Sequence, residues 1–241
     1  MTESLRLAVG LLTVLPVGRP PEVTRRRAGR AMLLAPLVGL GLGGLAAGVM
    51  WSGQRLGLSG LLAAVLATAL LAVATRGLHL DGLADTADGL GSRLPAEDAL
   101  RVMRGGDIGP FGVVTLVLVL AVQVSALAQS GPEVLLVAVP AGRLAITWAC
   151  RRGVPAARRD GLGAMVAGSV GVVPLLLVTA VVVAAAALLG WRGPVAVLAG
   201  VAASIALVGH SRGRLGGVTG DVLGACTETA TTVALVVLAT A

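Results

Sequence analysis

The residues best suited to chemistry are three aspartates that share one face of a predicted helix. Asp81, Asp85 and Asp88 lie in the segment RGLHLDGLADTADGLGS, residues 76–92, at spacings of i, i+4 and i+7. At about 100° per residue, this spacing keeps the three carboxylates within about 60° of one another. Carboxylates this close repel each other, and a divalent cation relieves the repulsion. With few imidazoles and thiolates in the chain, such oxygen ligands suit Mg²⁺ or Mn²⁺.

A row of aspartates is also typical of a helix face that only contacts water. Here the aspartates alternate with leucine and alanine, and they follow directly on an apolar stretch. Charged groups beside a membrane segment are costly unless they are used, which favours a functional site. His79 lies roughly opposite Asp81 on the helical wheel. A structural role and a proton-transfer role are both open for this histidine.

Two further segments combine glycine, arginine and aspartate. Residues 99–112 read ALRVMRGGDIGPFG, and residues 210–224 read HSRGRLGGVTGDVLG. The candidate phosphate-binding and metal-binding residues in them are Arg104, Asp107, Arg212, Arg214, Thr219 and Asp221. Arginine side chains and exposed backbone amides bind phosphate oxygens. Loop arginines also fix membrane topology, and Asp221 could cap a helix, so both interpretations stay open.

A fourth polar set contains Arg143 and, in the next loop, Arg151, Arg158, Arg159 and Asp160. Arg143 lies about two turns inside an apolar stretch. A buried arginine either extends its guanidinium to the interface or pairs with an anionic ligand. We therefore include Arg143 among the candidate substrate-binding residues.

Composition excludes several classes of protein. All 19 basic residues are arginine, so the chain lacks the lysine of a Walker A loop, a pyridoxal phosphate enzyme or a protein kinase. Two cysteines and two histidines show no zinc-binding spacing. The net charge of +7 could suggest nucleic acid, but one phenylalanine and three tryptophans offer little base stacking. We therefore expect a lipid bilayer, and no nucleic acid, as the partner of the arginines.

The fold class follows from hydropathy. The chain is 56% hydrophobic, and its mean hydropathy is +0.93. Stretches long enough to cross about 30 Å of hydrocarbon fall at 31–51, 58–75, 111–129, 133–149, 168–190, 194–210 and 222–241. We predict an all-α polytopic membrane bundle of about seven transmembrane helices, forming a single catalytic domain over residues 1–241. The first 18 residues are expected to form a short interfacial or re-entrant helix instead of a cleaved signal.

The arginines are divided unequally between the two sides of this topology. The segments before residue 31 and at 76–110, 150–167 and 211–221 carry 16 of the 19. Arginine-rich loops face the cytoplasm. The three glycine-rich motifs lie on the same side, so we expect a site that faces the cytoplasm.

Carboxylates, arginines and glycine-rich loops on one face of a membrane bundle together indicate phosphoryl transfer from an anhydride. In that chemistry, Mg²⁺ and arginines stabilise the charge of a diphosphate. The chain has no loop of the ATP-binding type, so the donor is expected to be activated already.

Three segments resemble the signature regions of the cobalamin synthase family, the adenosylcobinamide-GDP ribazoletransferases. They are HLDGLADTADGLGS, MRGGDIGPFGVV and GRLGGVTGDVLGA, at residues 79–92, 103–114 and 213–225. Weaker matches occur at LLTVLPVG, at Gly142-Arg143 and at residues 157–163. The resemblance therefore runs in order over nearly the whole chain.

The resemblance implies an integral enzyme of a prokaryotic cell membrane, active in the last steps of cobalamin assembly. Its substrates would be adenosylcobinamide-GDP and α-ribazole or α-ribazole 5′-phosphate, its product would include GMP, and it would need Mg²⁺. Asp81, Asp85 and Asp88 would bind the metal and the diphosphate, and Asp221 would complete the site. The sequence leaves open a homo-oligomer, the choice of acceptor and the general base, for which Asp88, Asp107, Asp221 and His79 are candidates.

The second motif departs from the family pattern. Many members read M-[RK]-D-S-x-I-G there, whereas this chain has Gly105 and Gly106 in place of the Asp-Ser pair. An aspartate, Asp107, follows two positions later. Asp107 could substitute through the flexible glycine turn, and no catalytic role is carried onto Gly105.

Two other classes of membrane protein share part of this pattern. Residues 85–93, DTADGLGSR, resemble the first half of the CDP-alcohol phosphotransferase motif DxxDGxxAR, but Val102 stands at the next expected glycine and no aspartate pair follows. An ion-coupled transporter would use the aspartates as a cation site. It predicts polar residues near mid-span and an internal repeat, yet only Arg143 and Glu228 lie inside the predicted spans.

Overall fold

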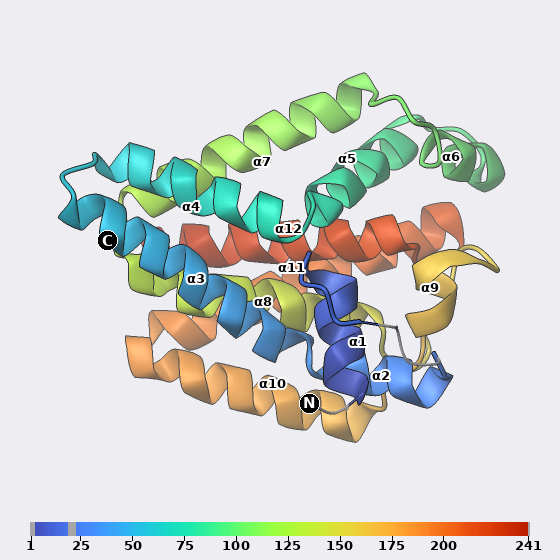
Figure 1. The fold of residues 1–241 in the computed structure, drawn as a ribbon. Helices are drawn as coiled ribbons and strands as arrows, with labels where there is room; N and C mark the ends of the chain where they lie inside the picture. The colour runs from blue at the N-terminus through green and yellow to red at the C-terminus, as the bar shows by residue number, and fades with distance from the viewer. Residues whose placement is uncertain (1–2, 19–22, 241) are drawn as a thin grey trace.

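The computed structural model describes residues 3–18 and 23–240, which form a bundle of α-helices (Figure 1). The helices are α1 (Glu3–Leu12), α2 (Arg25–Leu33), α3 (Ala35–Arg55), α4 (Gly60–Ala74), α5 (Leu78–Gly91), α6 (Ala96–Val102), α7 (Pro110–Ala128), α8 (Leu135–Ala149), α9 (Gly161–Val166), α10 (Val172–Ala186), α11 (Arg192–Leu215) and α12 (Gly220–Ala239). The 3-10 helices η1 (Pro132–Val134) and η2 (Ala187–Leu189) adjoin α8 and α10. Two isolated β-bridges, and no strand, occur in the described residues. The predicted all-α class is confirmed.

Six helical segments in the described ranges are long and apolar enough to cross a membrane. They are α3, α7, η1 with α8, α10 with η2, α11 and α12. A seventh candidate exists only if α4 and α5 count as one segment bent by 87°. The predicted span at 58–75 corresponds to α4, whose 15 residues reach about 22 Å at about 1.5 Å per residue. This length is short of a bilayer core, so the seventh member of the bundle is broken.

The break between α4 and α5 has a local cause. Arg76 and Gly77 both adopt left-handed backbone conformations, with φ of 55° and 68°. The N–H of Gly77 donates to the carbonyl of Ala72 at 2.7 Å, which closes the last turn of α4. The chain then changes direction and carries α5 toward the end of the bundle where α6 and α9 lie (Figure 1).

The centre of the bundle is α8, which is buried without interruption from Val137 to Thr147. It packs against α3, α11 and α12. Small residues permit the close approach of neighbouring helices: a Cβ on Gly200 of α11 would lie 2.7 Å from the carbonyl oxygen of Ala230 in α12. Without a water-driven force between helices, such contacts hold a membrane bundle together.

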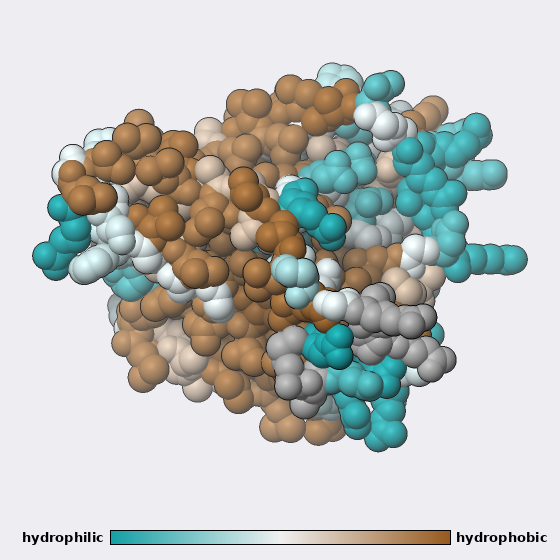
Figure 2. Space-filling model, in the orientation of Figure 1, coloured by the Kyte–Doolittle hydropathy of each residue, from teal (hydrophilic) through white to brown (hydrophobic). Residues whose placement is uncertain are grey.

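The outer face is apolar, as a lipid-facing surface requires. On α10, Val173, Leu177 and Val181 are each more than 60% exposed. Figure 2 shows hydrophobic residues over most of this face, whereas hydrophilic residues gather near α6, α9 and α2. The chain is therefore an integral membrane protein, and one end of it is strongly polar.

The predicted N-terminal helix is present as α1. Its ten residues span about 15 Å at about 1.5 Å per residue, too little to cross a bilayer. Leu7, Ala8 and Leu12 are buried against α2 and α3. The C-terminal end of α1 contributes Leu11 and Leu12 to a cavity wall, and the position of the helix at the membrane interface stays a prediction.

Candidate active site

A cavity of about 390 Å³ lies where α5, α9 and α12 meet α1. Its polar lining residues are His79, Arg104, Arg158, Asp160, Thr219 and Asp221. Much of the remaining wall is apolar and includes Leu12, Met32, Ile146, Leu162 and Leu223. Parts of all four polar sets from the sequence therefore meet in one place.

The start of α12 forms one side of this cavity. The Thr219 hydroxyl oxygen accepts a hydrogen bond from the N–H of Val222 at 3.2 Å, so Thr219 caps α12. The same hydroxyl donates to Asp221 Oδ2 at 3.1 Å. Of the two roles left open for Asp221, helix capping is therefore taken by Thr219. Because Thr219 performs that role, the Asp221 carboxylate is directed to another partner.

That partner is Arg158, whose Nη1 lies 3.6 Å from Asp221 Oδ2. Arg158 also donates from Nη2 to the carbonyl of Leu100 at 2.7 Å. Burial lowers the pKa of the Arg158 guanidinium, and the nearby Asp221 carboxylate opposes this shift. A partly desolvated arginine held by one carboxylate is well placed to bind a second anion.

The loop that carries Arg158 is fastened to the third glycine-rich motif. The N–H of Ala157 donates to the carbonyl of Val218, and the N–H of Val218 donates to the carbonyl of Pro155, both at 3.0 Å. A Cβ on Gly217 would overlap the Pro155 carbonyl oxygen, which explains why glycine occupies that position. These contacts fix Arg158 beside the start of α12.

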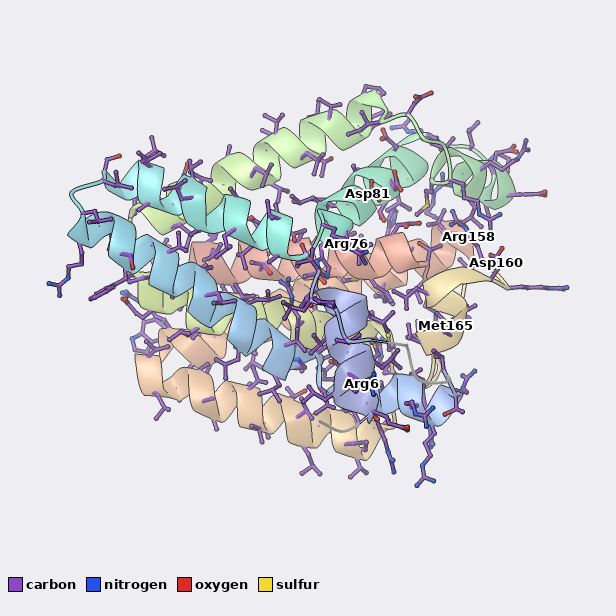
Figure 3. All side chains as sticks on the ribbon, viewed as in Figure 1. Arg6, Arg76, Asp81, Arg158, Asp160 and Met165 are labelled. Atoms are coloured by element: carbon purple, nitrogen blue, oxygen red, sulfur yellow. The ribbon has the colours of Figure 1, made fainter. Side chains whose placement is uncertain are left out.

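An exposed ion pair stands at the mouth of the cavity. Arg104 Nη2 donates to Asp160 Oδ1 at 2.7 Å, and both side chains are more than half exposed. Such a pair contributes little to stability, typically below about 1 kcal/mol. Arg104 can therefore leave Asp160 for a phosphate at small cost. Figure 3 shows Arg158 and Asp160 together at the polar end of the bundle and Asp81 on α5, nearer its middle.

The three aspartates of α5 share a face but not an environment. Asp81 is exposed, Asp85 is half-buried and Asp88 is buried. Asp85 interacts electrostatically with Asp81, Asp221 and Arg158, so it faces the start of α12. None of the three aspartates lines the cavity itself; Asp81 and Asp85 lie beside it.

Asp88 makes a different set of contacts. Its Oδ2 accepts from the N–H of Gly109 at 2.8 Å, and its Oδ1 accepts from the N–H of Gly112 at 2.9 Å. These amides belong to the N-terminal turn of α7, so Asp88 caps that helix from α5. A Cβ on either glycine would overlap the carboxylate. Gly109 and Gly112 of the second motif therefore leave space for the Asp88 carboxylate.

The carboxylates do not form a complete metal site by themselves. Among the described residues, no group of three His, Cys, Asp or Glu side chains is arranged to hold a metal ion. Mg²⁺ is usually bound by one or two carboxylates together with substrate phosphates and water. Asp81, Asp85 and Asp221 are electrostatically coupled oxygen donors and fit that incomplete kind of site.

His79 lines the cavity from α5 and is only 2% exposed. Neither ring nitrogen has a hydrogen-bond partner in the part of the chain that the structure describes. The close crossing of α5 and α12 fixes its place. A Cβ on Gly82 would lie 2.6 Å from the Asp221 carbonyl oxygen, and one on Gly224 would lie 3.1 Å from His79 Cα. This histidine is therefore buried, and its hydrogen-bonding groups are unpaired among the described residues.

Other residues selected from the sequence lie elsewhere. Asp107 and Arg212 are exposed, and Arg214 donates to the carbonyl of Leu94 at 3.4 Å; none of them lines the cavity. Arg143 is buried inside the bundle, where it interacts electrostatically with Glu228. The structure therefore brings Arg104, Thr219 and Asp221 to the cavity but leaves these four candidates apart from it.

Sequence reasoning did not select Arg158 and Asp160 as site residues. They belong to the fourth polar set, but nothing in their spacing indicated which of its arginines would face Asp221. The only signal that separated them was the weaker family match at residues 157–163. Leu12 and Met32 were missed because nothing in an apolar residue shows that it lines a cavity.

The sequence matches the family described as Cobalamin-5-phosphate synthase over residues 4–239. The chain belongs to this family. Its relatives include an adenosylcobinamide-GDP ribazoletransferase of Frankia casuarinae, 44% identical over 99% of this chain and 95% of the relative. Proteins of the same name from Nocardioides and Bradyrhizobium diazoefficiens are 44% and 38% identical, and each alignment covers at least 92% of both chains. No solved structure matches.

A cobalamin-5-phosphate synthase match over this length disfavours the two alternatives. The partial CDP-alcohol phosphotransferase motif at residues 85–93 lies inside the match, as do the aspartates that a transporter would use for a cation.

Proposed function

We propose that the chain transfers the adenosylcobinamide phosphoryl group from adenosylcobinamide-GDP to α-ribazole or its 5′-phosphate, releasing GMP. The observation that carries the proposal is the pairing of Arg158 with Asp221 at one cavity, with Asp85 electrostatically coupled to both from beside it, in a chain of this family. Each residue comes from a different polar segment. Together they supply the positive and negative groups that diphosphate chemistry needs.

The reaction breaks a phosphoanhydride bond of the donor and forms a phosphate ester bond to the acceptor. The acceptor hydroxyl oxygen forms a bond to the phosphorus that carries adenosylcobinamide, and the bond from that phosphorus to the bridging oxygen breaks. GMP leaves with the bridging oxygen, and the hydroxyl proton passes to a base. Asp221 is our choice for that base because it lines the cavity, whereas both Asp88 oxygens already accept backbone hydrogen bonds.

Arginine side chains hold the donor in this proposal. Arg158 binds the diphosphate from inside the cavity, since its guanidinium is already oriented by Asp221 and the Leu100 carbonyl. Arg104 exchanges Asp160 for a phosphate oxygen at the mouth. Both contacts strengthen as negative charge develops on the leaving GMP.

Mg²⁺ is part of the proposal. Asp81 and Asp85, with Asp221, would hold it together with the donor's phosphate oxygens, because the described carboxylates do not complete a site alone. When bound, the ion would offset negative charge on the diphosphate. Removal of divalent cations with a chelator should abolish turnover, and Mg²⁺ should restore it.

We also propose that the protein lies in the cell membrane of a prokaryote and that its site faces the cytoplasm. The cavity lies at the end of the bundle where hydrophilic residues gather (Figure 2). The loops of that end contain 16 of the 19 arginines by the sequence-based topology. Cysteine-accessibility labelling from each side of sealed vesicles would test the orientation.

The test of the activity is GMP release by purified protein supplied with adenosylcobinamide-GDP, α-ribazole and Mg²⁺. We expect Asp85→Asn to lower kcat by at least about 100-fold, the scale of losing one electrostatic contact to the transition state. Asp98→Asn is the matched control, because Asp98 lies on α6 and pairs with Arg101 outside the cavity. Absence of GMP release, or equal activity of Asp85→Asn and wild type, would reject the proposal.

A further inference from the structure

The cavity has two chemically different parts. Arg104, Arg158, Asp160 and Asp221 form its charged side, and aliphatic side chains and glycines form most of the rest. A volume of about 390 Å³ lies within the usual range for small-ligand pockets, roughly 300–1,000 Å³. The cavity is therefore suited to a small ligand with one apolar part and one polar part.

His79 is the polar exception within the buried part. It is 2% exposed, lines the cavity and has no hydrogen-bond partner in the described residues. An uncharged imidazole carries one N–H donor and one acceptor nitrogen. Leaving both unpaired in a buried position is costly, so a ligand with a single matching group would stabilise the occupied state.

The three components of the proposed reaction differ in how well they match this cavity. The corrinoid macrocycle is far larger than the cavity. Guanine presents several donors and acceptors on its edges, more than His79 alone can pair in the apolar part of the cavity. The base of α-ribazole is a methylated two-ring aromatic with a single free ring nitrogen, and its only other polar groups are on the ribose. It matches both the apolar wall and the lone histidine.

We propose that this cavity is the acceptor subsite: it encloses the aromatic base of α-ribazole, and His79 donates a hydrogen bond to the free ring nitrogen. The inference rests on the proposed function. With the base inside, the ribose hydroxyls lie toward Asp221 and Arg158, where the donor's diphosphate is bound. His79 is in this arrangement a specificity-determining residue that does not touch the transferred phosphoryl group.

The test measures acceptor binding separately from turnover. Equilibrium dialysis of α-ribazole against purified protein without donor gives its Kd, and steady-state GMP release gives KM for each substrate. Leu162→Trp fills the cavity from α9, and His79→Phe removes the ring N–H. We expect each to raise the Kd and KM for α-ribazole by about tenfold or more, with the KM for adenosylcobinamide-GDP changed less than about twofold.

Two further variants keep the result interpretable. Leu177→Trp adds the same side chain on the lipid-facing surface of α10 and should leave both substrates unaffected. His79→Gln retains an N–H donor and should bind α-ribazole more tightly than His79→Phe does. Leu162→Trp should also shift kcat/KM in favour of the riboside of a single-ring base, because the remaining space is smaller.

The outcomes separate this inference from the activity. GMP release with an unchanged KM for α-ribazole in Leu162→Trp and in both His79 variants would overturn the subsite and leave the activity standing. A rise in the donor's KM alone would assign the cavity to the donor and also overturn it. Loss of α-ribazole binding in the variants of a protein that releases no GMP would support the subsite while rejecting the proposed activity.

Discussion

Two contacts of α5 use the same kinds of residue for opposite purposes. At its C-terminal half, Asp88 is enclosed by the glycines at the start of α7 and caps that helix. In its N-terminal half, Gly82 lies against the start of α12, where Thr219 is the cap. Asp221 is thereby left to interact with Arg158 at a cavity.

The difference shows what decides the role of an aspartate beside a helix N-terminus. At α7, residue Gly109 has no side chain to cap the helix, and Pro110 follows, so a carboxylate from another helix takes that role. At α12 the helix supplies its own hydroxyl cap. A carboxylate that is not needed for capping is available for substrate.

The largest effect is expected at the α12 contact. Asp221→Asn should lower kcat by about 100-fold to 1,000-fold, because it removes the proposed base and a partner of Arg158. The melting temperature should stay close to that of wild type, since Thr219 still caps α12. Glu97→Gln, on exposed α6, serves as the control. Full activity in Asp221→Asn would remove the contrast.

Substitutions at the contact between Asp88 and the start of α7 should lower the stability of the protein. Asp88→Ala removes two charge-assisted hydrogen bonds to buried amides, which predicts a loss of roughly 2–3 kcal/mol in unfolding free energy. Thermal unfolding in detergent, followed with a fluorescent dye that does not react with cysteine thiols, would measure this loss of stability. Gly112→Ala should destabilise the protein too, because its Cβ would overlap Asp88. If Asp88→Ala instead unfolds like wild type and is inactive, Asp88 belongs with Asp85 at the reaction centre.

A substitution at the crossing of α5 and α12 should change both the stability and the activity. Gly82→Ala places a Cβ 2.6 Å from the Asp221 carbonyl oxygen and so pushes the two helices apart. We expect about 1–3 kcal/mol of destabilisation from overpacking and about a tenfold loss of kcat/KM from misplacement of the site. Gly41→Ala on α3 faces open space and is the matched control. Equal effects of both substitutions would mean that this crossing does not position the site.

The smallest effect is expected at the mouth. Arg104→Ala breaks an exposed ion pair with Asp160, so stability should change by less than about 1 kcal/mol. The KM for adenosylcobinamide-GDP should rise about threefold, and the rise should shrink at high salt because exposed charges are screened. Kinetics at two ionic strengths would show this. A loss as large as that of Asp221→Asn would place Arg104 inside the reaction centre.

The sequence was sufficient for the fold class and for the segments that carry the site. Hydropathy identifies membrane helices because a bilayer requires long apolar stretches. The shared helix face of Asp81 and Asp85 follows from their spacing and the helical period. Family motifs added the reaction. These inferences succeed because each depends on local chemistry.

The sequence did not show which residues of distant segments contact one another. Nothing in the segment 76–92 indicates that Asp88 faces the amides of Gly109 and Gly112, or that Arg158 instead of Arg212 meets Asp221. The break of α4 at Arg76 was also missed, because a left-handed arginine leaves no mark in hydropathy. Such features depend on contacts between distant segments.

The electrostatic interaction between buried Arg143 and half-buried Glu228 has a consequence for how the protein enters the membrane. Arg143 belongs to α8 and Glu228 to α12, so synthesis delivers the arginine 85 positions before the residue that offsets its charge. A lone arginine at mid-helix costs about 2.5–3.5 kcal/mol to insert. Helix α8 is therefore expected to stay beside the insertion machinery until α12 emerges. Release of the completed bundle into the lipid then depends on the synthesis of the last helix.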